Sequence, residues 1–555
     1  MSERIFIGVA WPYANSRLHL GHVAGAYLPA DIFARYHRAK GNEVLMISGS
    51  DIHGTPVTIR AEQEGKSPAE VAEHFHRLFL EDWAKLDISW DLFTTTGTDN
   101  HARVAQDIFL KLLDRGYIYK QEVTQPFCEN CQRYLPDRYV EGVCPLCSSD
   151  RARGDQCEQC GKPMNPADLL KAKCRICGTP PVYRESEHFF LKLSAFQDVL
   201  LEWIKGKDYW RPSVRRFSQR YLEEGLKDRA ITRDIEWGIP LPVPGYPGKS
   251  LYVWFEAVIG YLSASKEWAE KKGEPDAWMR FWHEGSARSY YFIGKDNIPF
   301  HTIVWPAMLT GYGGLELPYD VPANEFLTIE SQKFSKSRNL AVWTSDFLSR
   351  YDADPLRYLL SVNMPETSDT DFSWREFVRR NNDELVATYG NLVQRVLTFV
   401  YRRFDAVVPR PGPLDPASTV LLDSADSLIN TVGEFIERCR FKDAIREGMG
   451  LAQEANRYLD DKAPWKTINM DRTAAATALY SAIGVISALK TVFYPFLPRS
   501  SQRVYEYLGF DGVLSEAGWR LVVPEPGQAL KPPQTLFTKL EESVIAEEQE
   551  RMGLS

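Results

Sequence analysis

The first two-thirds of the chain alternates short apolar runs with helix-like stretches. The runs 5–10 and 43–48 are strand-like, and a helix-like stretch follows the first of them to about Lys40. Further along, the apolar runs 252–257 and 290–296 also have the composition of strands. This alternation predicts α/β units. The polar residues after 43–48 should then lie at the carboxyl edge of an open parallel sheet, where ligands bind.

The last third has a different periodicity. From about Asp371, apolar residues recur at helical spacing over 376–404, over 419–460 with internal breaks, and over 472–497. A proline-rich segment, 407–413, separates the first two stretches. The pattern predicts a domain built from long amphipathic helices.

Bulk properties narrow the class of protein. A chain of 555 residues is too long for one compact core, so several domains are expected. The N-terminus lacks a signal-peptide pattern and no run of 18 apolar residues occurs, which predicts a cytoplasmic protein without a membrane span. The net charge of −8 argues against a generally basic nucleic-acid binder but is compatible with local basic surfaces.

Cysteines are concentrated in one segment. Eight of the nine form Cys-x-x-Cys pairs, at Cys128/Cys131, Cys144/Cys147, Cys157/Cys160 and Cys174/Cys177. Two such turns can aim four thiolates at one tetrahedral ion, which predicts structural zinc. A disulfide framework and thioredoxin-like redox pairs are the competing interpretations. The ninth, Cys439, is predicted to be a small buried hydrophobe.

A histidine motif follows the first strand-like run. Gly21, flanked by His19 and His22, opens the helix-like stretch that reaches Lys40. Glycine leaves room for a purine to lie close to the backbone, and a helix N-terminus offers free N–H groups to an anion. Both imidazoles can donate hydrogen bonds to phosphate oxygens.

A second motif places two lysines and two serines in one loop, Lys-Phe-Ser-Lys-Ser at 333–337. Lys333 and Lys336 suit the negative charge that develops on a triphosphate during reaction. In this order, the two motifs predict chemistry at the α-phosphate of ATP. The alternative is a buried histidine pair and a solvated lysine loop.

With these features the chain resembles the methionyl-tRNA synthetases, which are class I aminoacyl-tRNA synthetases, from about Arg4 to Glu550. More specific segments carry the resemblance too: Pro12-Tyr13-Ala14-Asn15, Asp51-x-His53-Gly54-Thr55-Pro56, Asp137-Arg138-Tyr139-Val140, Ser186-Glu187-His188-Phe189-Phe190, Phe292-Ile293-Gly294-Lys295-Asp296 and Ala463-Pro464-Trp465. The two-knuckle cysteine pattern resembles the archaeal-like branch. The extra C-terminal dimerisation domain of some members is absent, which predicts a monomer.

The resemblance implies an α/β fold: a Rossmann-like catalytic domain split by a zinc-knuckle connective insertion, then an α-helical bundle that binds the anticodon. The expected boundaries are 1–118 and 221–325 for the catalytic halves, 119–220 for the insertion, 326–385 for the lysine loop and stem-contact region, and 386–555 for the bundle.

The resemblance also implies roles for single residues. One zinc ion would be held by Cys144, Cys147, Cys157 and Cys160, and a second by Cys128, Cys131, Cys174 and Cys177. The methionine pocket would comprise Ala10, Trp11, Tyr13, Trp254, Ala257, Tyr261, His301 and Trp305, with Asp51 pairing with the substrate ammonium. ATP, with Mg²⁺, would be bound by His19, Gly21, His22, Gly294, Lys295, Asp296 and Lys336; catalysis is assigned to His19, His22 and Lys336, supported by Lys333. Asn391, Arg395 and Trp465 would read the anticodon.

The implied reaction activates L-methionine with ATP to methionyl-adenylate and pyrophosphate. Methionine then passes to the 3′ end of tRNA(Met), both initiator and elongator. The alternatives are a class I synthetase for another amino acid and a non-catalytic, synthetase-derived tRNA-binding scaffold. The chain departs from the family pattern at Trp11, Glu256, Val258 and Phe334, where leucine, aspartate, proline and methionine are common.

Overall fold

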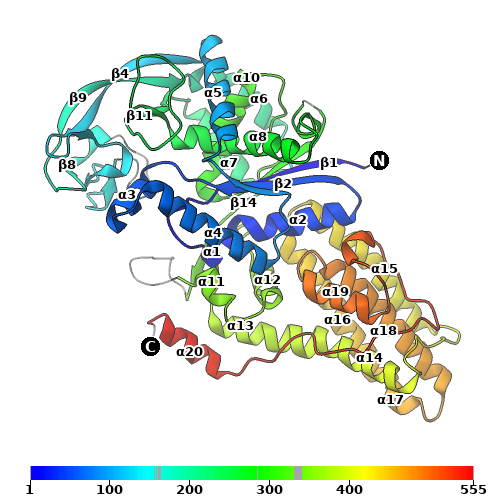
Figure 1. Cartoon of the computed structure of the whole chain (residues 1–555). Helices are drawn as coiled ribbons and strands as arrows, with labels where there is room; N and C mark the ends of the chain where they lie inside the picture. The colour runs from blue at the N-terminus through cyan, green and yellow to red at the C-terminus, as the bar shows by residue number, and fades with distance from the viewer. Residues whose placement is uncertain are drawn as a thin grey trace.

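The structure of the protein is a computed structural model that describes residues 2–154, 157, 159–160, 164, 166–283, 285–330 and 341–553. Figure 1 shows three regions in space: a central α/β region, a cysteine-rich lobe on one side of it, and a helical region on the other. The C-terminal helix α20 (Ser543–Arg551) returns along α13 (Trp374–Arg380) towards the α/β region.

A parallel five-stranded sheet forms the centre of the α/β region. Its strand order is β14-β13-β1-β2-β3, with bounds Ala323–Asn324, Arg288–Gly294, Arg4–Val9, Glu43–Ser50 and Leu92–Thr95. From β1 the chain passes through the helix α2 (Leu28–Ala39) to β2 on one side, and it returns much later to β13 on the other. The strand order therefore reverses next to β1, which makes the carboxyl ends of these strands the expected ligand site.

Three of the four predicted strands are confirmed, and one is wrong. The runs 5–10, 43–48 and 290–296 are β1, β2 and β13. The run 252–257 instead begins the helix α8 (Val253–Lys271). This helix is buried on most of its circumference against α5 (Asp99–Asp114) and the sheet. A helix that is apolar all round shows no helical periodicity, so its first aromatic turn has the composition of a strand.

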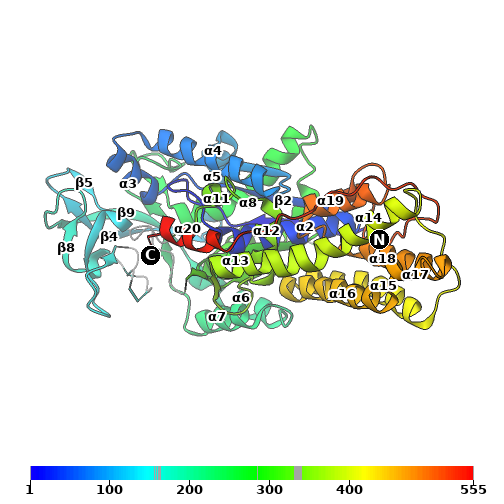
Figure 2. The ribbon, with the colours of Figure 1, turned by 90° about the horizontal axis from the view of Figure 1, so that it is seen from below.

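The insertion extends from a long antiparallel ribbon. Strands β4 (Ile118–Cys128) and β9 (Val182–Leu191) pair over ten residues. A three-stranded sheet lies beyond them, in the order β7-β6-β8, with bounds Ala152–Arg153, Val140–Val143 and Leu170–Cys174. Its buried residues form a small core of their own that includes four cysteines. Figure 2 shows this lobe at the opposite end of the molecule from α17 (Pro464–Thr467).

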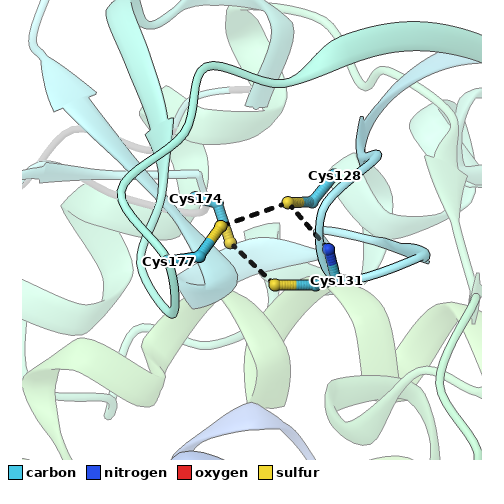
Figure 3. A group of neighbouring side chains, drawn as sticks. All are labelled: Cys128, Cys131, Cys174 and Cys177. Atoms are coloured by element: carbon cyan, nitrogen blue, oxygen red, sulfur yellow. Dashed lines mark hydrogen bonds between the residues drawn. The ribbon is translucent and has the colours of Figure 1, made fainter.

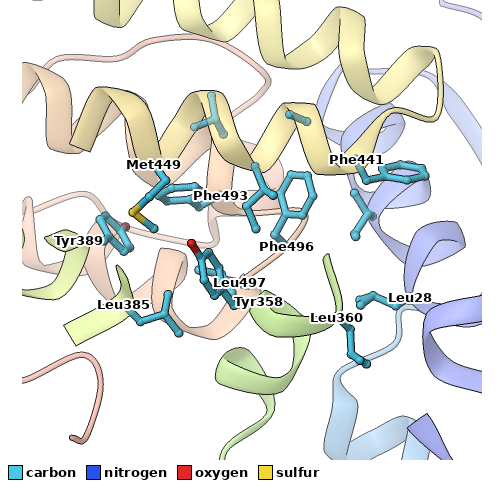
Figure 4. Close-up of a cluster of buried hydrophobic side chains, with 14 of the residues drawn as sticks. Leu28, Tyr358, Leu360, Leu385, Tyr389, Phe441, Met449, Phe493, Phe496 and Leu497 are labelled. Carbon is cyan, nitrogen blue, oxygen red and sulfur yellow. The ribbon is translucent and has the colours of Figure 1, made fainter. Parts of the chain in front are cut away.

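The helical region matches the predicted stretches. The stretch 376–404 is a continuous helical run in which a π-helical segment, Asn381–Gly390, joins α13 to α14 (Asn391–Arg403). The later stretches are α15, α16 and α18, with bounds Pro416–Glu437, Phe441–Lys462 and Arg472–Phe493. Buried aromatic and aliphatic side chains from several of these helices pack into one core (Figure 4). The predicted fold class is therefore confirmed.

The helix α18 is the one candidate for a membrane span among the described residues. An 18-residue window of this helix has a mean hydropathy of 1.5, and 94% of the window is buried inside the molecule, as is usual for the central helix of a bundle.

Cys439 is 4% exposed, as predicted for a small buried hydrophobe.

Candidate functional site

A cavity of about 460 Å³ opens at the carboxyl ends of β1, β2 and β13, where the strand order reverses. Side chains from segments more than 300 residues apart line it: Ala10, Trp11, Pro12, Tyr13, His19, Gly21, His22, Gly25, Ala26, Tyr27, Asp51, Trp254, Ala257, Val258, Tyr261, Gly294, Asp296, Asn297, His301, Glu325, Phe326, Leu327 and Thr328.

The histidine motif forms one end of the cavity. His19 is the N-cap residue of α1 (Leu20–His22), and its backbone N–H donates to Nδ1 of His22 at 3.1 Å. The two rings lie 3.7 Å apart, centroid to centroid. The helical run that starts here continues to Ala39, so the positive end of its dipole is at the cavity. This end of the cavity is suited to phosphate.

Lys333 and Lys336 lie outside the described residues, but described residues on both sides of them lie close to the cavity or to the histidine motif. Thr328, in β15 (Leu327–Ile329), lines it. On the other side, Trp343 forms an antiparallel bridge with His19, and the Leu20 N–H donates to the Val342 carbonyl at 3.1 Å. The fold thus ties the chain that flanks the second motif to the first motif.

Aromatic rings form the opposite end. Tyr13 and Trp254 make a T-shaped contact, with ring centroids 6.1 Å apart and planes at 87°. Trp254 also stacks on Phe300, with centroids 4.1 Å apart and planes at 15°. Rings held in this way give a polarizable side chain a rigid wall to pack against.

A hydrogen-bonded pair fixes the polar part of this wall. Nδ1 of His301 donates to the Asn297 carbonyl at 2.9 Å, so its Nε2 accepts from the Tyr261 hydroxyl at 2.8 Å. Burial lowers the pKa of His301 to about 4, outweighing that hydrogen bond. His301 is therefore neutral near pH 7, with the proton on Nδ1.

Asp51 is the buried acid of the cavity. Its backbone is held on both sides, with its N–H donating to Pro12 at 2.9 Å and its carbonyl accepting from Ala14 at 2.8 Å. Burial, and then the charge of Glu256, raise the pKa of Asp51 well above 3.8. A carboxylate in such a place gains from a cationic ligand, because the cation offsets both effects.

Two predicted residues lie next to the cavity and do not line it. Trp305 is fully buried behind the wall, where its Nε1 donates to the Tyr291 hydroxyl at 3.2 Å. The ammonium of Lys295 pairs with Glu325 and Asp369, each at 2.8 Å. These partners come from distant segments, so spacing within the motif around 292–296 could not reveal them.

Several lining residues carry no motif signal. Tyr27 is on the second turn of the helical run, where its hydroxyl donates to the Ala10 carbonyl at 3.0 Å. Residues 325–328 reach the cavity because they follow the edge strand β14. Only the strand order brings them there.

The eight paired cysteines come together in the two predicted sets (Figure 3 shows one). Sulfur–sulfur distances are 3.4 and 3.9 Å in the set Cys128, Cys131, Cys174 and Cys177, and 4.0 and 3.6 Å in the set Cys144, Cys147, Cys157 and Cys160. A disulfide needs about 2 Å. Four thiolates around zinc at about 2.3 Å lie roughly 3.8 Å apart, so both donor sets fit zinc.

The predicted anticodon residues gather at the far end of the helical region. The Arg395 guanidinium lies over the Trp465 ring, 4.0 Å from its centroid, and pairs with Asp460 at 2.9 Å. Asn391 is exposed one turn before Arg395 on α14. A half-exposed aromatic ring beside a cation can stack on unpaired bases.

Comparisons with known proteins cover nearly the whole chain. Residues 5–397 match the family of class I (M) tRNA synthetases, and residues 408–554 match the anticodon-binding domain of methionyl-tRNA ligase. The chain is 66% identical to a methionine–tRNA ligase of Dehalococcoides mccartyi, across 100% of both chains. It is 52% identical to the one from Thermomicrobium roseum, across 100% of this chain and 99% of the relative. A crystal structure of Mycobacterium tuberculosis methionyl-tRNA synthetase with methionyl-adenylate superposes with a TM-score of 0.80 at 25% identity, covering 97% of this chain and 100% of that one.

Proposed function

The chain belongs to the methionyl-tRNA synthetases of class I, and from this premise we propose that its cavity holds methionine and ATP side by side and joins them. One observation carries the proposal: a single cavity joins the buried carboxylate of Asp51 and an aromatic wall to the His19–His22 helix start. Methionine fits the first end, and a triphosphate fits the second.

At the methionine end, Asp51 pairs with the ammonium, and Tyr13 and Trp254 pack against the thioether. The methionine carboxylate then points towards the histidine end and attacks the α-phosphorus in line, while pyrophosphate leaves. Alignment and charge stabilisation supply most of the rate for such a displacement. Because His301 is neutral, its Nε2 accepts the hydrogen bond from the Tyr261 hydroxyl and fixes the direction of that hydroxyl.

At the ATP end, His19 and His22 donate hydrogen bonds to phosphate oxygens, and Gly294 and Asp296 receive the ribose. Mg²⁺ accompanies the phosphates as part of the substrate. Lys336, with Lys333 in support, stabilises the negative charge that builds up on the leaving pyrophosphate. The bridge between Trp343 and His19 supports this assignment, because it brings the described residues that follow the lysine motif beside the proposed phosphate site.

The second step transfers methionine from the adenylate to the 3′ end of initiator and elongator tRNA(Met). Asn391 and Arg395, at the start of α14, and Trp465 on α17 read the anticodon. We further propose that the protein works in the cytoplasm and as a monomer; sedimentation of the purified chain tests the oligomeric state.

Each cysteine set holds one structural zinc ion. We expect metal analysis of the purified protein to find about two zinc ions per chain, and about one in a Cys144→Ser variant. Cys439→Ser is the matched control, because Cys439 lies in the helical core and should leave the zinc content unchanged. Fewer than two zinc ions in the unaltered protein would contradict the assignment of one set.

The deciding experiment is ATP–pyrophosphate exchange with each of the twenty amino acids. Exchange that depends on methionine alone is expected. Exchange with another amino acid would favour the first alternative, a synthetase of different specificity. No exchange with any amino acid, measured on folded, zinc-loaded protein, would favour the second alternative, a non-catalytic tRNA-binding scaffold. Lys336→Ala should slow exchange greatly while methionine binding is nearly unchanged.

A further inference from the structure

His53 joins Asp51 to a buried cluster behind the cavity. Its backbone N–H donates to Oδ1 of Asp51 at 3.2 Å, while its imidazole points the other way, with Nδ1 2.7 Å from Oε1 of Glu256. The carboxylate that faces the substrate and the carboxylate behind the wall are therefore connected through one residue.

Both oxygens of Glu256 are used in this cluster. The side chain is fully buried in the first turn of α8, and its second oxygen lies 2.6 Å from Nε2 of His101. Burial alone would raise the pKa of Glu256, but the imidazoles of His53 and His101 outweigh it and lower the pKa to about 2. Glu256 therefore stays ionised and attracts both imidazole N–H groups.

His101 anchors the cluster to the body of the fold. It is on the first turn of α5, it is 1% exposed, and its Nδ1 lies 2.8 Å from the Ser263 hydroxyl on α8. That hydroxyl donates in turn to the Gly260 carbonyl at 3.1 Å. The cluster thus joins the turn after β2 to two packed helices.

None of Glu256, His53 and His101 is among the described residues that line the cavity. We propose that Glu256 is a positioning residue for methionine recognition: by holding His53, it fixes the turn 51–54 and aims the Asp51 carboxylate at the substrate ammonium. This inference rests on the proposed role of Asp51.

Positioning can be separated from an effect of Glu256 on the protonation of Asp51 by the sign of the result. The charge of Glu256 raises the pKa of Asp51. If that were its whole influence, removing Glu256 would favour ionised Asp51 and strengthen the binding of an ammonium. Positioning predicts weaker binding, because the carboxylate loses its fixed direction.

The test uses Glu256→Met, which is of similar length and removes both acceptors. Two competitive inhibitors of methionine-dependent ATP–pyrophosphate exchange report on it: methioninol, which keeps the amine, and 4-(methylthio)butanoate, which lacks it. We expect the inhibition constant of methioninol to rise about 10-fold and that of the amine-free acid to change less than about 2-fold. The KM for methionine should rise with kcat and the KM for ATP nearly unchanged.

Combination with Asp51→Asn tests whether Glu256 acts through Asp51. The double variant should behave like Asp51→Asn alone, because the second change has nothing left to position. Additive effects, equal losses for the two inhibitors, or tighter methioninol binding would each overturn the proposal. If Asp51→Asn itself leaves methioninol binding unchanged, the proposed ammonium site fails instead.

Three further variants distinguish lost positioning from a general loss of stability. His53→Leu removes one link to Glu256, and His53→Asn places an amide donor near the position of Nδ1 and should restore methioninol binding. Asp354→Leu is the matched control, since it removes another buried carboxylate, which accepts from Ser500 at 2.6 and 2.7 Å in the helical region. It should lower stability without changing the ratio of the two inhibition constants.

Discussion

Trp11 occupies its place because two glycines leave room for its ring. A Cβ at position 260 would lie 2.7 Å from the Trp11 ring, and the Trp11 ring also crowds Gly49. Glycine at these two positions, on α8 and β2, is thus the complement of the tryptophan at position 11. Side-chain size at one position decides which residues are tolerated at the others.

Gly260→Ala is expected to lower the free energy of unfolding by about 1–3 kcal/mol through overpacking. Trp11→Leu should restore most of this loss in the double variant, because the nearest contacts at position 260 all come from the indole. Urea unfolding of the single and double variants measures both effects.

Gly49→Ala provides the contrast. A Cβ there would also lie 2.6 Å from the backbone carbonyl of Thr94, which a smaller residue 11 does not move. Trp11→Leu should therefore rescue Gly260→Ala better than Gly49→Ala. Equal rescue of the two variants would show that the backbone of β2 adjusts to the added methyl group as readily as that of α8, and would contradict this expectation.

Methionine binding should weaken on acidification, starting well above pH 4. Burial and Glu256 raise the pKa of Asp51, so the carboxylate is lost as the pH falls through this raised value, and the ammonium loses its partner. The KM for methionine, measured between pH 5 and 8, should rise towards the acid end. A KM that does not vary with pH would contradict the assignment, and 4-(methylthio)butanoate should show no such loss.

At the scale of single elements, burial explains why the strand prediction for 252–257 was wrong, and it makes Lys490 a target for a stabilising substitution. The first turn of α8 has a strand-like composition because almost every face of that helix is covered. The helix α18 is likewise buried nearly throughout, and it carries Lys490, which is 1% exposed. The Lys490 ammonium has a hydroxyl, Thr491 Oγ1, at 3.0 Å and lies over the rings of Tyr505 and Phe510.

Lys490→Met should stabilise the protein at pH 7 by roughly 1–3 kcal/mol, and less at pH 10. Burial lowers the pKa of Lys490 to about 7, while the unfolded chain keeps the ordinary 10.5. Between these values the unfolded state holds one more proton, so this group's contribution to stability rises with pH, and removing it helps most near pH 7. Thermal unfolding at both pH values, with exposed Lys466→Met as control, measures the difference.

At the scale of the whole molecule, one buried guanidinium joins the catalytic and helical regions. Arg357 is fully buried, pairs with Asp31 at 2.7 Å, and donates to the Phe496 carbonyl at 2.8 Å. Asp31 is on α2, the helix that continues the His19 motif, and Phe496 follows α18. Pairing one buried arginine across both regions holds them in a defined relation, since breaking it would leave a buried charge uncompensated.

The two functional ends of this rigid arrangement should be separable. Trp465→Ala is expected to lower kcat/KM for tRNA aminoacylation by roughly tenfold or more, because it removes a stacking surface and the support of Arg395. Methionine-dependent ATP–pyrophosphate exchange should be unchanged, since α17 is at the far end of the helical region from the sheet (Figure 1). Trp465→Phe should retain most of the aminoacylation. An equal fall in both reactions would mean that Trp465 is structural.

The sequence by itself determined the features that depend on local spacing. Cys-x-x-Cys turns, the histidine motif after a strand, and helical periodicity from about Asp371 are patterns of residues close along the chain. The two cysteine sets, the helix start at the cavity and the bundle were therefore all predictable. The same local information fails for 252–257, because a helix that is buried over most of its surface loses its clear periodicity.

Only the tertiary structure decided which residues from distant segments complete the cavity and contact the motif residues. The strand order brings Tyr27, Asn297 and residues 325–328 to the same cavity as Asp51, and it places Trp305 behind the wall. It also turns Lys295 towards Glu325 and Asp369, and sets Glu256 between two histidines from separate segments. These contacts join residues 30 to more than 200 positions apart, and such pairings follow from sheet topology and close packing, which no local pattern of residues encodes.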